Sequence, residues 1–135
     1  MAIRTLVVDD EADILRLIEI KLKKAGFEVT TARDGQEGLD KALAIKPDLL
    51  LIDVMMPKLD GYSVVAEVRN VLGAESPIII LLTARGQETD VIKGLTSGAD
   101  DYIIKPFSPR ELIARINVAL IKSGKHTTPP SASEL

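Results

Sequence analysis

Residues 49–53 read Leu49-Leu50-Leu51-Ile52-Asp53, four large apolar residues in a row followed directly by a carboxylic acid. A second run, Ile78–Leu82, is also wholly apolar and is followed by Thr83. A strand that is apolar at every position has both faces covered, which is typical of a parallel sheet with helices on each side. The two runs therefore predict the centre of an α/β fold.

Three shorter strands and five amphipathic helices fit around these two runs. The other strands are predicted at 3–8, 27–32 and 102–104. One helix is predicted after each of the five strands, at 14–25, between Asp34 and Pro47, from Gly61 to Leu72, at 88–96 and from Ser108 to 121. Five strand–helix units joined by right-handed crossovers predict a doubly wound five-stranded parallel sheet of order 2-1-3-4-5, a flavodoxin-like (βα)5 fold.

The 135 residues suit one domain. We assign residues 1–121 to it. Residues 122–135 have no apolar stripe, so we interpret them as a flexible tail or the stub of an interdomain linker.

Composition excludes several classes of protein. The chain has no cysteine, which excludes disulfides, thiolate metal sites and cysteine nucleophiles. Its net charge of −3 and its few aromatic residues argue against binding to nucleic acid or to an anionic membrane. No apolar run approaches membrane-spanning length, and the N-terminus lacks a signal peptide. We therefore expect a cytoplasmic protein.

Polar residues whose side chains can bind ligands or react follow four of the predicted strands. They are Asp9 and Asp10, Asp53, Thr83 and Lys105. The carboxyl ends of parallel strands meet at one edge of a sheet, where such folds bind ligands. Three ionised carboxylates at that edge would repel one another by about 3 kcal/mol for each pair at ~5 Å. A hard divalent cation would relieve this repulsion, and Mg²⁺ fits because it needs few carboxylates.

A metal beside a carboxylate also suits phosphoryl transfer. Asp53, at the end of the central strand, is the best-placed nucleophile and would form an acyl phosphate. Lys105 and the hydroxyl of Thr83 would then bind phosphoryl oxygens alongside the metal. The alternative is that the acids are simply hydrated at the rim of an open crevice.

Five motifs, in this order and spacing, resemble the response-regulator receiver domain of bacterial two-component systems (CheY-like). They are Val7-Val8-Asp9-Asp10-Glu11, Leu51-Ile52-Asp53-Val54-Met55-Met56-Pro57, Asp60-Gly61, Leu82-Thr83-Ala84 and Lys105-Pro106-Phe107. The resemblance covers about residues 3–121. The 2-1-3-4-5 order is that of the family's chemotaxis member, so part of the topology comes with the resemblance.

The resemblance implies a phosphoacceptor switch in a two-component phosphorelay, not a conventional enzyme. Asp53 would accept a phosphoryl group from a sensor histidine kinase, and the domain would promote its own Mg-dependent phosphorylation and dephosphorylation. The Mg²⁺ ligands would be Asp10, Asp53 and the main-chain carbonyl of Met55, with Asp9 acting through water.

The same resemblance implies how the switch operates. Phosphorylation would draw Thr83 toward the phosphate, and Tyr102 would move into the vacated space, changing dimerisation or partner binding. The bond between Lys105 and Pro106 is expected to be cis.

Residues 98–116 are most similar to the OmpR/PhoB subgroup, whose members carry a DNA-binding domain and regulate transcription. The similarity implies a candidate homodimer through the fourth helix, fifth strand and fifth helix. The matching positions are Lys93, Asp100, Asp101, Glu111, Arg115 and Lys122. Val91 stands where the subgroup usually has a basic residue, so one ion pair would be missing. These 135 residues do not include such a DNA-binding domain, so we expect either a chain truncated at a linker or a stand-alone receiver, which would not bind nucleic acid directly.

Three other classes of protein share this topology or chemistry. A dehalogenase-type phosphatase would need a second Asp two residues after Asp53, where Met55 stands. A flavodoxin-type flavin carrier would need a Ser/Thr/Gly-rich loop after the first strand, where the chain reads Asp9-Asp10-Glu11. A purely structural interaction module would leave the convergent acids unexplained.

Overall fold

Five parallel strands form one sheet in the part of the chain that the structure, a computed structural model, describes: residues 2–84 and 98–124. The strands are β1 (Arg4–Val8), β2 (Glu28–Ala32), β3 (Leu49–Asp53), β4 (Ile78–Ala84) and β5 (Asp101–Lys105). Their order is β2-β1-β3-β4-β5 and every pairing is parallel. Both the strand order and the α/β class predicted from the sequence are confirmed.

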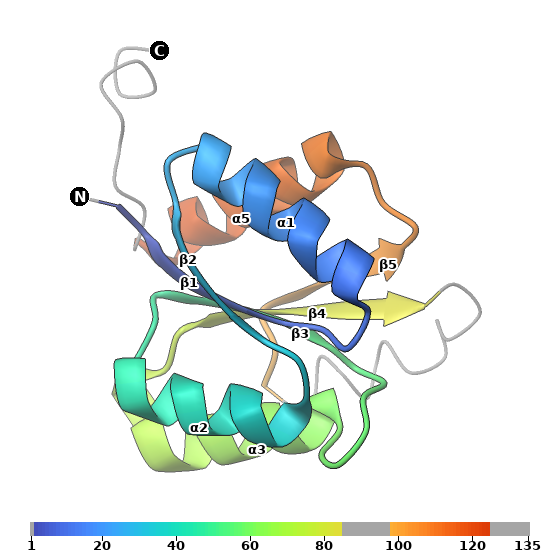
Figure 1. Ribbon diagram of the computed structural model, residues 1–135. Coiled ribbons are helices and arrows are strands. Elements are labelled where there is room, and N and C mark those ends of the chain that lie inside the picture. The colour runs from blue at the N-terminus through green and yellow to red at the C-terminus, as the bar shows by residue number, and fades with distance from the viewer. Residues whose placement is uncertain (1, 85–97, 125–135) are drawn as a thin grey trace.

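Helices cover both faces of the sheet. They are α1 (Ala12–Lys24), α2 (Gly35–Ile45), α3 (Gly61–Leu72) and α5 (Pro109–Ser123), with a short 3₁₀ turn, η1 (Gly73–Glu75). Figure 1 shows α1 and α5 on one face and α2 and α3 on the other. The helix predicted at 88–96 lies outside the described residues. None of the described helices is long and apolar enough to cross a lipid bilayer.

Alternating residues of the strands belong to two separate hydrophobic cores, one on each face of the sheet. Leu49, Leu51 and Ile80 pack with α1 and α5, whereas Leu50, Ile52 and Ile79 pack with α2 and α3. Every residue of β3 is buried, as its continuous apolar run predicts. β2, at the edge of the sheet, is mostly half-buried, in line with its mixed composition.

Side-chain caps begin the helices where the sequence predicts. The carboxylate of Asp34 accepts a hydrogen bond from the backbone N–H of Glu37 at 2.8 Å, and the hydroxyl of Ser108 accepts one from the N–H of Glu111 at 3.0 Å. Helix α5 continues to Ser123, two residues beyond the predicted boundary at 121. The rest of the predicted tail, from residue 125, lies outside the described residues.

The helical spacing of apolar residues in α3 predicts that Val64, Val65, Val68, Val71 and Leu72 all face the core, but one of them is exposed. Val64, Val65, Val68 and Leu72 are buried, but 53% of Val71 is accessible to solvent. Val71 lies at the edge of the helical stripe and in the last turn, where its short side chain does not reach the sheet.

Candidate functional site

Three strands deliver charged side chains to one side of the sheet at its carboxyl edge. Asp53 and Lys105 are the last residues of β3 and β5, and Asp9 directly follows β1. The residue two positions before each belongs to the core between the sheet and helices α1 and α5; these residues are Val7, Leu51 and Ile103. Because side chains alternate along a strand, Asp9, Asp53 and Lys105 share that face and can meet.

The ammonium of Lys105 lies among three carboxylates. Its Nζ is 2.8 Å from Oδ2 of Asp9, 3.0 Å from Oε1 of Glu11 and 3.4 Å from Oδ2 of Asp53. The Lys105 side chain is 13% exposed, so these ion pairs are only partly screened by water. The bond between Lys105 and Pro106 is cis, as expected.

Asp9 is fully buried and is held through both oxygens. Its Oδ2 accepts the hydrogen bond from Lys105, and its Oδ1 accepts one of 2.9 Å from the backbone N–H of Glu11. Asp9 therefore fixes the turn between β1 and α1, on which Asp10 and Glu11 stand.

Burial and neighbouring charge perturb Asp53. Its side chain is 8% exposed. Burial, with the negative charge of Asp9 as the second cause, raises the pKa of Asp53 to about 7, although Lys105 opposes the shift. Burial alone would lower the pKa of Lys105, but hydrogen bonds to Asp9 and Glu11 and the charge of Asp53 raise it above its ordinary value. Lys105 is thus a permanent cation, and the acids around it remain in excess.

The carboxylates of Asp9, Asp10 and Asp53 form a cluster suited to a cation. One oxygen from each lies within 4.8 Å of the others. Asp9 and Asp53 are buried and Asp10 is half-buried, so the cluster opens to solvent on the side of Asp10. Oxygen donors with an open side are the ligands that Mg²⁺ accepts in proteins. Burial, and after it the charge of Asp9, raises the pKa of Asp53, and a bound cation would favour the ionised carboxylate against both.

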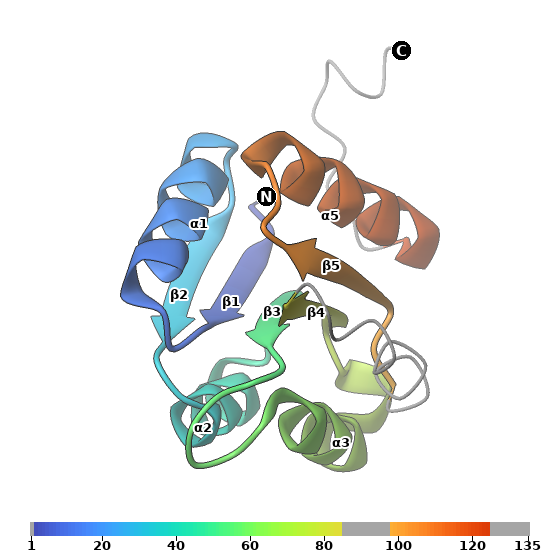
Figure 2. The same cartoon turned by 90° about the vertical axis from the view of Figure 1, so that its right-hand side faces the viewer.

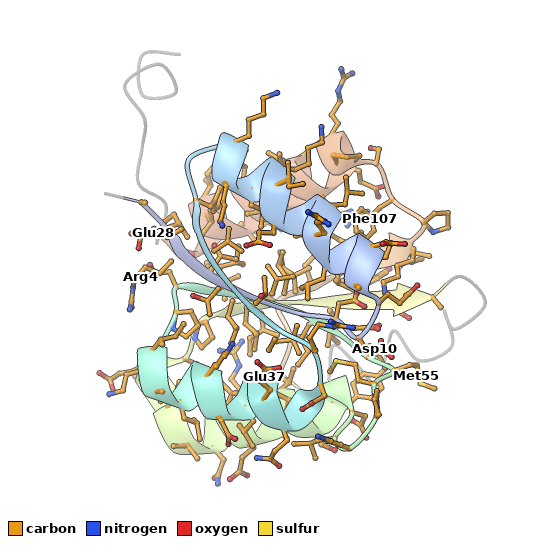
Figure 3. The ribbon with its side chains drawn as sticks, in the orientation of Figure 1. Arg4, Asp10, Glu28, Glu37, Met55 and Phe107 are labelled. Carbon is orange, nitrogen blue, oxygen red and sulfur yellow. The ribbon has the colours of Figure 1, made fainter. Side chains whose placement is uncertain are left out.

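Met55 borders this cluster from the loop between β3 and α3. Its side chain is exposed, and Figure 3 places it at the same end of the molecule as Asp10. The loop is pinned at Gly61, whose N–H donates to the carbonyl of Val54 at 2.9 Å. A Cβ at Gly61 would lie only 2.5 Å from the main-chain oxygen of Asp53. Glycine therefore allows α3 to begin directly against the end of β3.

Thr83 and Tyr102 lie on the other face of the sheet. Tyr102 is paired in register with Leu81, two residues before Thr83, so the two side chains point to the same side from adjacent strands. Thr83 is buried, and its Oγ1 has no hydrogen-bond partner among the described residues. Tyr102 is half-buried and packs against the α2–α3 core. A buried hydroxyl without a partner is available to a ligand at this edge.

The predicted dimer-face residues make ion pairs within the subunit. Arg115 lies 3.5 Å from Asp101 and 3.4 Å from Glu111. The carboxylate of Asp100 accepts hydrogen bonds from Arg69 at 2.9 Å and from the N–H of Ile79 at 2.7 Å.

Asp101, Glu111 and Arg115 line a groove with residues of α5, including Lys122. Figure 2, which looks toward the carboxyl ends of the strands, shows α5 beside β5 at the upper right. Lys93 and Val91 lie outside the described residues. Dimerisation therefore stays a prediction.

Sequence reasoning missed two residues that organise this end of the fold. In the sequence Glu11 stands out only as part of a motif, yet it is the second-nearest acid to Lys105. Arg69 donates to the carbonyl of Gly98 at 2.7 Å and of Pro77 at 3.1 Å, and so ties α3 to the start of β5. Neither residue had a signal in the sequence, because each acts on segments far away along the chain.

The fold and the site define a doubly wound α/β protein with an acid-rich, lysine-containing site at the carboxyl ends of β1, β3 and β5. The pattern of the family described as "Response regulator receiver domain" matches residues 5–117. The chain belongs to this family, and the resemblance noted from its motifs is confirmed.

Named relatives and solved structures agree with this membership. The chain is 52% identical over 126 residues to "Probable transcriptional regulator ycf27" of Porphyra purpurea, covering 93% of this chain and 50% of that protein. It is 48% identical over 120 residues to "Alkaline phosphatase synthesis transcriptional regulatory protein PhoP" of Bacillus subtilis (strain 168), covering 89% of this chain and 49% of that one. The chain thus spans about half the length of these relatives.

Among solved structures, the chemotaxis response regulator CheY4 of Vibrio cholerae superposes with a TM-score of 0.83 at 32% identity, covering 89% of this chain and all of that one (100%). A response regulator of Chloroflexus aurantiacus superposes with a TM-score of 0.84 at 36% identity, covering 90% of this chain and 99% of that one. Membership in the receiver family disfavours the phosphatase and flavodoxin alternatives.

Proposed function

We propose that the domain is a switch that accepts a phosphoryl group on Asp53. The observation that carries the proposal is the position of this buried carboxylate, 3.4 Å from the ammonium of Lys105 and beside two further acids. An oxygen of Asp53 attacks the donor's phosphorus, the bond from phosphorus to the donor atom breaks, and the donor leaves with its electron pair. Lys105 binds a phosphoryl oxygen as negative charge develops on it.

Asp10, Asp53 and the main-chain carbonyl of Met55 would hold Mg²⁺, with Asp9 acting through water. When bound, the metal supplies positive charge to the transferring phosphoryl oxygens and relieves the repulsion among the acids. The same arrangement, with water in place of the donor, allows the domain to promote its own dephosphorylation. This is a self-limiting reaction of one group and not the turnover of a conventional enzyme.

Phosphorylation would bias two states of the domain through Thr83 and Tyr102. The unpartnered Oγ1 of Thr83 gains an acceptor when a phosphoryl oxygen reaches the rim of the sheet. Tyr102 lies on the same face of the adjacent strand, so it responds to the space that Thr83 leaves. Ligand-biased populations of this kind need no new fold, only a few kcal/mol of differential interaction.

The phosphodonor would be a sensor histidine kinase, as expected for a receiver of a two-component system. Output would pass through dimerisation across the β5–α5 face, with Asp101, Glu111 and Arg115 exchanging their internal partners for those of a second copy, and Asp100 and Lys93 beside them. Because the named relatives are transcriptional regulators about twice as long, we propose that the domain controls transcription when joined to a DNA-binding domain.

Acetyl phosphate with Mg²⁺ tests the proposed reaction without a kinase. We expect one phosphoryl mass increment on the intact chain, located to the peptide that contains Asp53 and absent from Asp53→Asn. Phosphorylation of both proteins, or at another residue, would contradict the assignment. Sustained turnover of generic phosphomonoesters would favour a phosphatase instead.

A further inference from the structure

The side chain of Glu11 has an ion pair and no role in helix capping. Glu11 occupies the N-cap position of α1, but its carboxylate accepts no hydrogen bond from the first turn. It reaches instead to Lys105, 94 residues away along the chain, at 3.0 Å. Its backbone is fixed by the hydrogen bond from its N–H to Asp9, so the contact is held in place by the site itself.

The ammonium of Lys105 has three N–H donors and three carboxylate neighbours. Asp53, the farthest at 3.4 Å, is the attacking group and stays beside the ammonium until its bond to phosphorus forms, so an incoming phosphoryl oxygen competes with Asp9 and Glu11. Asp9 is fully buried, so if it gave way its Oδ2 would lose the hydrogen bond from Lys105 at a position that water does not reach. Glu11 is 59% exposed at its side chain, so water can replace its contact at little cost.

We propose that Glu11 is a resident competitor for Lys105: it occupies the ammonium in the unphosphorylated domain and gives way when a phosphoryl oxygen arrives. This inference rests on the proposed phosphorylation of Asp53 and extends it. Glu11 acts through Lys105 and is a positioning residue. The exchange would make capture of small anionic phosphodonors less favourable than it would be at a free lysine.

Glu11→Gln tests the exchange because it keeps the shape of the side chain and removes its charge. Asp13→Asn is the matched control. Asp13 is exposed in the first turn of the same helix, and the acids that pair with Lys105 are Asp9, Glu11 and Asp53. The rate of phosphorylation by acetyl phosphate is measured against donor concentration at saturating Mg²⁺. Mg²⁺ affinity is measured in parallel for each variant.

For Glu11→Gln we expect a lower half-saturating donor concentration, by about two- to fivefold relative to Asp13→Asn, which is the size of one partly exposed ion pair. The maximal rate should change less. The advantage should shrink at high ionic strength, where the ion pair is screened. Mg²⁺ affinity should be similar in the two variants, which separates competition for Lys105 from direct binding of the metal.

Equal donor dependence in the two variants, or slower phosphorylation of Glu11→Gln, would overturn the competition. A much weaker Mg²⁺ affinity in Glu11→Gln alone would overturn it in favour of a metal ligand. If the unsubstituted domain takes up no phosphoryl group, the proposed function fails instead, so the two failures are distinguishable.

Discussion

Substituting Asp53 by Asn should stabilise the metal-free domain at alkaline pH. The pKa of Asp53 is raised from 3.8 to about 7 in the folded protein, chiefly by burial and then by the charge of Asp9. The folded state therefore holds this proton more tightly than the unfolded chain, and stability is lost as pH rises between about 4 and 7. The difference between the folded and unfolded pKa values of Asp53 corresponds to a loss of at most about 4 kcal/mol in the free energy of unfolding. Asn carries no charge and avoids this loss.

Urea denaturation in the presence of a chelator measures the effect. At pH 8 we expect Asp53→Asn to be more stable than the parent by up to about 4 kcal/mol, and at pH 5 by up to about 1.7 kcal/mol. Asp13→Asn, which removes an exposed carboxylate outside the cluster, should change little at either pH. Adding Mg²⁺ should reduce the difference in stability between Asp53→Asn and the parent, because the metal stabilises the parent by binding its folded state.

The reasoning would be refuted if parent and Asp53→Asn had equal stability at pH 8 without metal. It would be refuted equally by a difference that does not vary with pH. Either result would mean that the acids are hydrated and do not repel one another in the folded state.

Three further substitutions test other parts of the account. Lys105→Ala should still incorporate some phosphoryl group, more slowly, but lose the accompanying change in the Tyr102 amide resonance; full retention of that change would contradict the role of Lys105. Gly61→Ala places a Cβ 2.5 Å from the main-chain oxygen of Asp53 and should cost about 1–3 kcal/mol in urea denaturation; an unchanged midpoint would show that the loop yields freely. Arg69→Ala leaves the carbonyl of Gly98 without its donor and should cost about 1–3 kcal/mol, whereas Arg16→Ala on the exposed face of α1 should cost little.

The fold was predictable because its signals are local. The apolar runs of β3 and β4, the caps at Asp34 and Ser108, and the alternation of strands with helices each act within a few residues. Strand order follows from handedness and from the family resemblance. Helical spacing locates the core less well: among the described residues, Val71 of α3 and Leu17 of α1 stand at positions of the apolar stripe, yet both are exposed.

The sequence predicts which residues form the site but not which contacts they make with one another. That Asp9, Asp53 and Lys105 meet follows from their positions at strand ends, which are visible in the sequence. The sequence does not show which acid lies nearest to Lys105, because Asp9 and Glu11 are 96 and 94 residues away from it along the chain. Their distances to Lys105 depend on how the side chains lie in the folded protein. For the same reason the sequence does not reveal that Asp100, a predicted dimer-face residue, accepts hydrogen bonds from Arg69 and Ile79 within the subunit.

A crystal structure of the domain grown with Mg²⁺ and fluoroberyllate, a phosphoryl mimic, tests the central claim most directly. We expect the mimic bound to a carboxylate oxygen of Asp53, the metal held by Asp10 and Asp53, and Lys105 and the hydroxyl of Thr83 in contact with separate fluorides. A mimic bound elsewhere, or a Lys105 ammonium that remains on Asp9 and Glu11 alone while Asp53 is occupied, would contradict it.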